Sequence, residues 1–339
     1  MGTRFYGLMV SIPGMTKESD RREARAISPE EAFAVLGEKT RLEILRALGD
    51  AGGPLAFSEL FERVEYETTA NFSYHLDKLV GHFVHESEDG YELRQSGRRV
   101  VEAILSGAVT EAPVLDPTEI DRQCQHCGAD SVTVEYVEEQ VGVYCTQCRG
   151  QYGGDADTDG SDLPANRERI GYAYLPPAGL RSRTPAGALD AAATWSALQA
   201  QSLHRGVCPR CSAAVEDTVQ ACESHSLTDD ICTHCDRRFA VVSHSQCTNC
   251  PFELSGAAIG HLHARTEVLA FLLNHGVDPF APDADGTLEA ASFAEEVVET
   301  EPLLARFTFT IDGDELAVTV DEDFAVLDAV ERRSAEPPS

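Results

Sequence analysis

The chain has 339 residues, and its 57 acidic and 27 basic residues give a formal net charge of -30 at pH 7. Its hydrophobic content of 42% is that of a globular protein, and its length allows two or three domains with separate cores. No run approaches the roughly 20 apolar residues of a membrane-spanning helix, so we expect no membrane partner.

The acidic residues are spread along the whole chain, and only three of the 27 basic residues are lysines: Lys17, Lys39 and Lys78. An acidic tail would concentrate its charge in one block. The even spread resembles the proteins of salt-accumulating halophiles, whose hydrated carboxylate surface keeps them in solution. Ten of the eleven cysteines form Cys-x-x-Cys pairs, which predicts reduced, metal-binding thiols and a cytoplasmic location.

Residues 1–27 contain a short apolar patch near their start. The patch lacks the preceding basic cluster and the following small-residue cleavage site of a signal peptide. We therefore expect residues 1–27 to be a disordered tail, with Met15 as an alternative natural start.

Residues 28–108 carry the signals of four helices, a hairpin and a fifth helix. The run Ser28-Pro29-Glu30-Glu31 combines an N-cap serine, a first-turn proline and a capping-box glutamate. Gly37 separates the first two helices, and Ser58 is expected to cap a short third one. Asp89-Gly90 predicts a hairpin turn, and Ser96 is expected to cap the last helix.

The fourth helix is predicted in the stretch TTANFSYHLDKLVGHFV, residues 68–84. At 100° per residue its apolar side chains share one face, and polar side chains occupy the other. The apolar face consists of Phe72, Leu76, Leu79 and Val80. The opposite face carries Ala70, Asn71, Tyr74, Asp77 and Lys78.

The run EAFAVLGEKTRLEILRAL, followed by SYHLDKLVGHFV and a hairpin, resembles the ArsR-type winged helix-turn-helix regulators, particularly those of halophilic archaea. The resemblance covers about 80 of the 339 residues. It implies a transcriptional regulator that binds double-stranded DNA as a homodimer, with residues 69–81 as the recognition helix. The residues that would contact bases or phosphates are Asn71, Ser73, Tyr74, Lys78, Arg94, Arg98 and Arg99.

Two features of this segment limit the resemblance. The helix SELFERV has none of the cysteines that metal-sensing members carry before the recognition helix, so arsenic-type sensing is not implied. Residues 28–108 also hold 8 basic and 15 acidic residues, a net charge of -7 that opposes DNA binding in dilute salt. In molar salt the Debye length is about 3 Å, so we expect the local cations to decide the contact.

Residues 118–150 predict a zinc ribbon. Two knuckles each turn a pair of thiolates inward, Gly128 permits the tight turn after the first, and VTVEYVEEQVGVYC supplies two hairpin arms. Four sulfur ligands with no open position suit tetrahedral structural zinc rather than catalysis. The four expected ligands are Cys124, Cys127, Cys145 and Cys148.

Residues 184–256 predict a helix followed by a double zinc-knuckle module. Four consecutive ligand pairs, each with two residues between its members, could hold two zinc ions, for three per chain. Sequential use would join the first pair to the second and the third to the fourth, whereas cross-braced use would join first to third and second to fourth. Cys222 and His225 are the least secure pair, with a buried thiol and a surface histidine as the alternative. The pairs are Cys208/Cys211, Cys222/His225, Cys232/Cys235 and Cys247/Cys250.

Residues 151–183 are expected to form an acidic linker. Within it, Asp155-x-Asp157-x-Asp159-Gly160 imitates the start of a calcium loop, but Asn166 stands at the twelfth position where a calcium loop has Glu. The linker interpretation is therefore preferred.

Residues 257–335 predict a small α+β domain. We expect one helix over residues 259–275, a hairpin around Asp312-Gly313 and a short helix that ends at Arg333. Part of this region resembles the zinc-bearing accessory domain found with halophilic winged helices. Two histidines of the first helix stand two positions apart and are expected at the surface: His261 and His263.

The sequence thus predicts an α+β multidomain protein, a winged helix-turn-helix followed by zinc ribbon and knuckle modules and a small α+β C-terminal domain. The leading interpretation is a sequence-specific transcriptional regulator whose zinc sites brace a C-terminal sensor or partner-binding domain. The alternative is a basal initiation factor resembling the large subunit of archaeal TFIIE, which would act through contact with the transcription machinery. No phosphate-binding loop, nucleophile motif or open metal site is found, so an enzyme is not expected.

Overall fold

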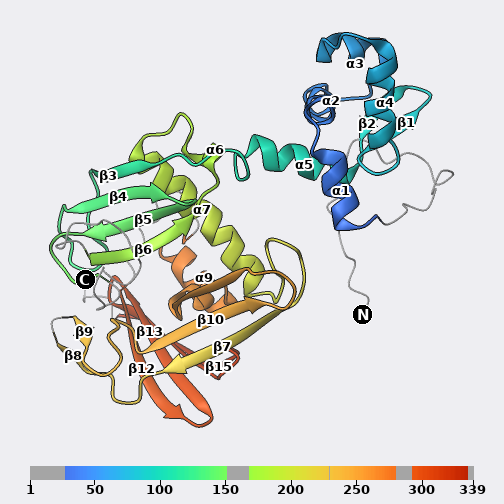
Figure 1. Ribbon diagram of the computed structural model, residues 1–339. Coiled ribbons are helices and arrows are strands. Elements are labelled where there is room, and N and C mark those ends of the chain that lie inside the picture. The colour runs from blue at the N-terminus through green and yellow to red at the C-terminus, as the bar shows by residue number, and fades with distance from the viewer. Residues whose placement is uncertain (1–26, 151–167, 229, 280–291, 335–339) are drawn as a thin grey trace, which may run out of the picture. The chain divides into compact units, whose positions relative to one another are not determined.

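The computed structural model describes residues 27–150, 168–228, 230–279 and 292–334 (Figure 1). The chain divides into two compact units, with the boundary between Leu105 and Ser106. All but the last residue of the tail expected over residues 1–27, and the aspartates of the calcium-like pattern, lie outside the described residues. In the described part, no helix is long and apolar enough to cross a membrane.

The first unit has its elements in the order that the sequence predicts: four helices, a hairpin and a fifth helix. Two of the expected caps differ. The third helix starts one residue before Ser58, with Ala56 as its N-cap, and the fifth starts before Ser96, whose hydroxyl donates to the carbonyl of His82. The elements are α1 (Pro29–Leu36), α2 (Lys39–Asp50), α3 (Phe57–Val64), α4 (Thr69–Leu79), β1 (Val84–Ser87), β2 (Gly90–Leu93) and α5 (Gln95–Leu105).

Local signals explain where these elements start and stop. Ser28 and Glu31 form the predicted capping box, and Gly37 ends α1. Gly90 has a φ of +120°, and a Cβ there would lie 2.3 Å from the carbonyl oxygen of Leu55. Because Leu55 and the residue after Gly90 exchange backbone hydrogen bonds, only glycine fits this approach of the hairpin to the α2–α3 loop.

The core of the first unit lies between α2, α3, α4 and the hairpin. Phe72 is fully buried and contacts Phe57 and Phe61 edge to face, with ring centroids 5.5 and 5.3 Å apart. Leu76 and Leu79, one and two turns further along α4, are buried as well. The apolar face predicted for α4 therefore packs on the core, and Val80 is half-buried at its end.

The second unit begins with an antiparallel sheet in the order β3-β4-β5-β6, covered by the long helix α7 (Figure 1). Residues 168–174 form the fourth strand of this sheet, so the linker expected over residues 151–183 is wrong for its second half. The strand pairs with β5 along most of its length, with a register shift between Val143 and Tyr144, and no local signal in the sequence indicated this pairing. The elements are β3 (Leu115–Glu119), β4 (Val132–Val137), β5 (Gln140–Cys145), β6 (Glu168–Tyr174), α6 (Pro177–Leu180) and α7 (Pro185–Leu203).

The centre of the second unit is a long antiparallel hairpin of β7 and β10, extended by β11. A small ribbon of β8 and β9 lies in the connection between β7 and β10. These strands are β7 (Val215–Ala221), β8 (Leu227–Thr228), β9 (Ile231–Cys232), β10 (Val241–Cys247) and β11 (Glu253–Ala257).

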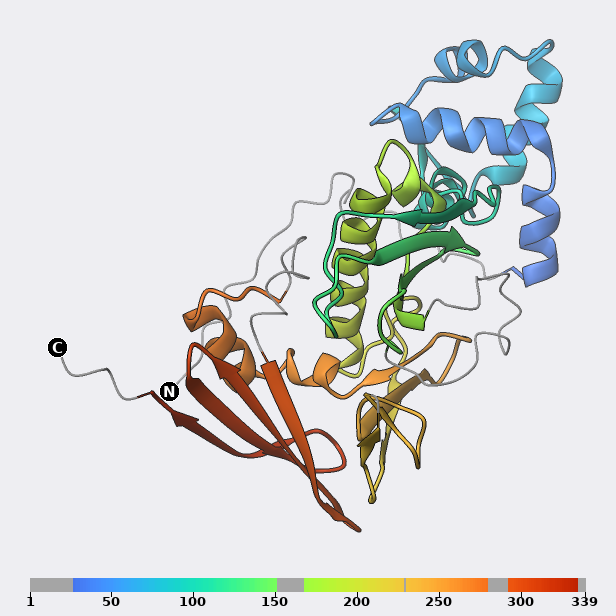
Figure 2. The same cartoon turned by 90° about the vertical axis from the view of Figure 1, so that its left-hand side faces the viewer.

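The C-terminal part holds two helices and a four-stranded antiparallel meander, seen from another side in Figure 2. Two expectations are wrong here. The helix predicted over residues 259–275 is broken after Leu262 into two, and the last segment is a strand that pairs with β14 rather than a helix. The elements are α8 (Ile259–Leu262), α9 (Thr266–Asn274), β12 (Ser292–Thr300), β13 (Leu303–Ile311), β14 (Asp314–Val320) and β15 (Val326–Arg332).

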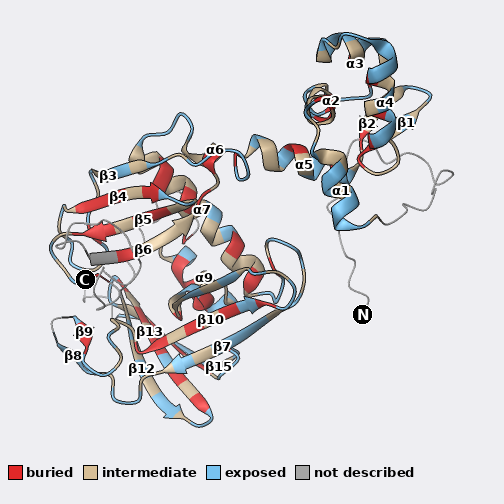
Figure 3. Ribbon diagram, viewed as in Figure 1, coloured by how far each residue is buried: buried red, intermediate tan, exposed pale blue. Residues whose placement is uncertain are grey.

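One core joins this meander to the central hairpin. Ala240 and Val241 of the hairpin region pack in the same cluster as Phe271 of α9 and Phe307 of β13. The predicted division at residues 256/257 therefore passes through a continuous core. Figure 3 shows the buried positions along β10 and β13.

Candidate metal centres and candidate nucleic-acid interface

Three groups of four ligand side chains converge in the second unit. Within each group the ligand atoms lie within 4.8 Å of one another, and every residue that the sequence offered as a ligand belongs to one group. The first ribbon site is Cys124, Cys127, Cys145 and Cys148; the outer hairpin site is Cys208, Cys211, Cys247 and Cys250; the inner hairpin site is Cys222, His225, Cys232 and Cys235.

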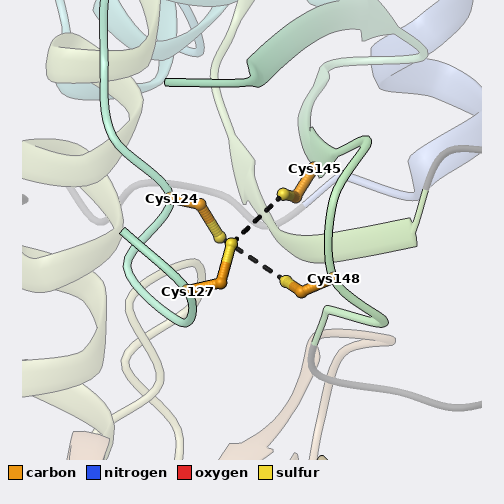
Figure 4. Close-up of side chains that lie close together, drawn as sticks. All are labelled: Cys124, Cys127, Cys145 and Cys148. Carbon is orange, nitrogen blue, oxygen red and sulfur yellow. Dashed lines mark hydrogen bonds between the residues drawn. The ribbon is translucent and has the colours of Figure 1, made fainter. Parts of the chain in front are cut away.

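The first ribbon site confirms the grouping expected from the spacing. The knuckle after β3 and the knuckle at the end of β5 face each other, and their four sulfurs point inward (Figure 4). The Sγ atoms of Cys124 and Cys148 are 3.7 Å apart, and those of Cys127 and Cys145 are 3.8 Å apart. Gly128, with a φ of +68°, makes the tight turn predicted for it.

The two hairpin sites are nested, so both pairings drawn from the sequence, sequential and cross-braced, are wrong. The pair Cys208/Cys211 precedes β7 and the pair Cys247/Cys250 stands at the end of β10. Since the register of the hairpin sets Val215 opposite Cys247, these outer pairs meet at one end. The inner pairs, Cys222/His225 and Cys232/Cys235, follow β7 and precede β10, and they meet at the other end.

The same knuckle geometry recurs at the three sites. In five knuckles the first cysteine accepts a hydrogen bond from the backbone N–H two residues later, at 3.3 to 3.4 Å. In one knuckle of each site the residue after the second cysteine has a left-handed φ; these residues are Gly128, Ser212 and Asp236. Glycine signals this turn at the first site only, so Ser212 and Asp236 could not be recognised from residue type.

These N–H donors favour thiolates. Burial alone would raise the pKa of the Cys232 thiol, but hydrogen bonds from the N–H groups of Ser226, His234 and Cys235 outweigh it and lower the pKa to about 6. In the same site, burial raises the pKa of the Cys222 thiol, and the neighbouring Cys235 raises it further. Neighbouring negative charges repel each other, and a divalent cation with four soft ligands would stabilise all of them as thiolates.

The inner hairpin site also orients its histidine. Nδ1 of His225 lies 3.6 Å from Sγ of Cys235, and Nε2 lies 3.1 Å from the carbonyl oxygen of Arg238. An Nε2–H that donates to this carbonyl leaves the lone pair of Nδ1 directed at the three sulfurs, as a metal ligand requires. Cys222 and His225, the least secure pair in the sequence, are therefore placed as ligands.

Arg238 is a residue that the sequence did not single out. Its side chain is 13% exposed, its Nε donates to the carbonyl of Gly150 at 2.9 Å, and its guanidinium lies 3.3 Å from Asp230. Gly150 follows Cys148 by two residues, so Arg238 contacts the loop of the first ribbon site with its side chain and His225 with its backbone. No motif could have indicated a contact between segments so far apart in the chain.

The histidines expected at the surface are not there. His261 is 5% exposed, its ring stacks on Phe324 with centroids 4.6 Å apart, and it meets the ring of His204 at 3.8 Å. His263 is half-buried. Burial lowers the pKa of His261 to about 4 and that of His204 to about 3, so both are neutral near pH 7. The rings that cover His261 come from distant segments of the chain, and the spacing of the two histidines did not indicate them.

In the first unit, α4 leaves one face uncovered. Asn71, Tyr74, Asp77 and Lys78 are exposed, with Tyr74 at 57%, and Nζ of Lys78 lies 5.4 Å from the centre of the Tyr74 ring. Lys39 pairs with Glu43 at 3.3 Å, whereas Lys78 has no acidic partner among the described residues. This face offers an amide, a phenol and a free cation in one helical stripe.

The four other residues expected at a DNA contact are one serine of α4 and three arginines outside the β1–β2 hairpin. Arg94 follows β2 and is half-buried. Arg98 and Arg99 are exposed but belong to α5 rather than to the hairpin. Ser73 of α4 is half-buried, between the apolar and the exposed faces.

Two families match the chain, one in each unit. Residues 29–104 match the family described as Domain of unknown function (DUF7347), and residues 121–326 match the family described as Domain of unknown function (DUF7351). No curated protein and no solved structure matches the chain. The second match covers more than half of the chain and contains all three ligand clusters.

Proposed function

The chain belongs to the family described as Domain of unknown function (DUF7351), and we propose that this member is a sequence-specific transcriptional regulator. In this proposal the first unit is a winged helix-turn-helix that binds double-stranded DNA. The family region is a zinc-braced domain that senses a signal or binds a partner.

The observation that carries the DNA-binding proposal is the two-sided character of α4. Its apolar side fills the core of the first unit through Phe72 and Leu76, while Asn71, Tyr74 and Lys78 stay exposed. The helix follows α3 after a short turn and precedes the β1–β2 hairpin, which is the order of a helix-turn-helix with a wing. An exposed amide and cation on such a helix suit base edges and phosphates.

The acidity of the chain does not oppose this proposal at high salt. At molar ionic strength the Debye length is about 3 Å, so carboxylates elsewhere on the first unit hardly affect a phosphate bound at α4. Lys78, Arg98 and Arg99 are exposed and form no ion pair within the described residues. They remain available to phosphates, and Asp77 next to Lys78 is suited to accept from a cytosine amino group.

For the three ligand clusters we propose structural zinc. Two clusters have four cysteines and one has three cysteines and a histidine, which are the ligand sets of closed tetrahedral zinc sites. Each metal would join two segments that are distant in sequence: the two knuckles of the ribbon at the first site, and the segments that flank β7 and β10 at each end of their hairpin. The role of these metals would be to stabilise the fold of the family region. The proposed regulator is a cytoplasmic protein that acts as a homodimer.

The test is selection of genomic DNA fragments by the full-length protein in molar KCl. A regulator should recover a small, recurring set of promoter fragments that share a sequence. Enrichment of every promoter, together with co-purification of RNA polymerase, would contradict the proposal and favour a basal initiation factor. Recovery of random fragments would reject sequence-specific binding.

A further inference from the structure

The strand β15 forms an open edge of the C-terminal meander. It pairs with β14 on one side, and no strand of the described residues pairs with its other side. The exposed side chains include apolar ones, with Leu327 at 57% and Val330 at 42%. An exposed edge of this length is a template for pairing with another strand.

The turn before β14 determines which backbone groups face the open edge. Asp312 and Gly313 have left-handed φ values of 52° and 87°, so Ile311 and Asp314 flank a two-residue hairpin turn and exchange both backbone hydrogen bonds. Alternation along β14 then directs the N–H and C=O of Ala317 toward β15, where Val330 is its partner. Consequently Ala329 and Glu331 direct their backbone groups toward the open edge.

The charges of β15 favour one self-pairing register. Two copies paired antiparallel about a two-fold axis must place one residue opposite its own copy. With Asp328 or Glu331 at the axis, like charges meet, and with Ala329 at the axis Asp328 faces Val330. With Val330 at the axis, Asp328 of each copy faces Arg332 of the other, at two places, and Val330 faces Val330.

This register also agrees with the backbone. With Val330 at the axis, Ala329 of each copy faces Glu331 of the other, and both direct their hydrogen-bonding groups at the open edge. Asp328 and Arg332 then form non-hydrogen-bonded pairs, in which side chains approach most closely. Arg332 is opposite Glu315 in β14, so its guanidinium would lie between two carboxylates.

From the open edge and this charge match we propose that β15 pairs antiparallel with β15 of a second copy of the chain about Val330. The two meanders then form one continuous eight-stranded sheet. Charged side chains often protect an edge from aggregation, and here the same charges select one partner and one register. The contact lies in the second unit, so it stands independently of any DNA binding by the first.

The test compares self-association of the full-length, zinc-loaded chain and its variants by sedimentation equilibrium. Asp328→Arg and Arg332→Asp each place like charges opposite each other, so each variant alone should associate at least tenfold more weakly than the unsubstituted chain. A mixture of the two variants restores both opposite-charge pairs and should form mixed dimers. That rescue cannot arise from a general loss of folding.

A third variant tests the backbone contact between the two strands. This test does not rely on charge, so salt screening does not weaken it. Ala329→Pro removes an N–H that faces the open edge and spares the bonds to β14, so it should abolish the same association step with an unchanged circular dichroism spectrum. A chain that is monomeric at all concentrations overturns the proposal. Association that is unchanged in both Asp328→Arg and Ala329→Pro also overturns it, because the contact would then lie elsewhere. Neither outcome depends on the result of the DNA selection.

Discussion

Replacing Arg238 by Ala should loosen two of the three metal sites and leave the third unchanged. The guanidinium donates to the carbonyl of Gly150, a buried residue two positions after the ligand Cys148. The backbone carbonyl of Arg238 itself accepts a hydrogen bond from His225 of the inner hairpin site. Removing the side chain leaves the Gly150 carbonyl without this donor and frees the segment that positions the histidine.

The magnitude follows from these contacts. Loss of a charged donor to a buried carbonyl costs about 1–3 kcal/mol, while the ion pair with Asp230 adds little because Asp230 is 54% exposed. Outer-sphere partners of metal ligands change metal affinity by about 10- to 100-fold when they are removed. We therefore expect zinc to leave the first ribbon site and the inner hairpin site about tenfold faster or more.

The assay is the rate of zinc transfer to a chromogenic chelator, resolved into its phases. Arg210→Ala is the matched control, since the Arg210 guanidinium lies 5.4 Å from the Phe252 ring, next to the outer hairpin site. The control should change at most one phase, and Arg238→Ala should accelerate two. Equal acceleration of all three zinc ions by Arg238→Ala, or none, would refute a link through this side chain.

Three further predictions concern the site pairing, the buried histidine and the hairpin turn. Cys208→Ser and Cys247→Ser should each lower the zinc content from three to two per chain by elemental analysis. The double variant should stay at two because both ligands serve one site, whereas Cys208→Ser combined with Cys232→Ser should fall to one. Burial lowers the pKa of His261 from 6.5 to about 4, so the unfolded chain binds the extra proton between these values and stability is lost as pH falls through this window. When the pH is lowered from 7 to 5.5, the free energy of unfolding of His261→Phe should therefore fall by about 1 kcal/mol less than that of the unsubstituted chain, as measured by denaturant titration. An identical fall in the two chains would contradict the buried, neutral ring. Gly90→Ala should lower the free energy of unfolding by about 2–4 kcal/mol, since its Cβ would lie 2.3 Å from a backbone oxygen; a change below about 0.5 kcal/mol would show that the turn relaxes.

Much of the first unit follows from local signals in the sequence. Ser28 and Gly37 suffice to place the ends of α1, and the spacing of Phe72, Leu76 and Leu79 gives the face of α4 that is buried. The ligand residues of all three metal sites were also evident, because Cys-x-x-Cys spacing has few other uses.

The features that the sequence did not predict depend on contacts between distant segments. The nested pairing of the hairpin sites depends on the register that places Val215 opposite Cys247, which no spacing rule contains. The run Val326–Arg332 has residues that also suit a helix, and pairing with β14 outweighs that preference. His261 is buried between the rings of His204 and Phe324, which come from distant segments of the chain.

The proposed regulator depends above all on a contact between DNA and the exposed face of α4. Its most direct test is the affinity for one selected promoter fragment as a function of KCl concentration, for Lys78→Ala and for Lys39→Ala. Both lysines are exposed, but Lys39 lies on α2 and pairs with Glu43. Lys78→Ala should weaken binding and reduce the slope of log affinity against log salt by about 1, with Lys39→Ala unchanged. Equal behaviour of the two variants would contradict a DNA contact at α4.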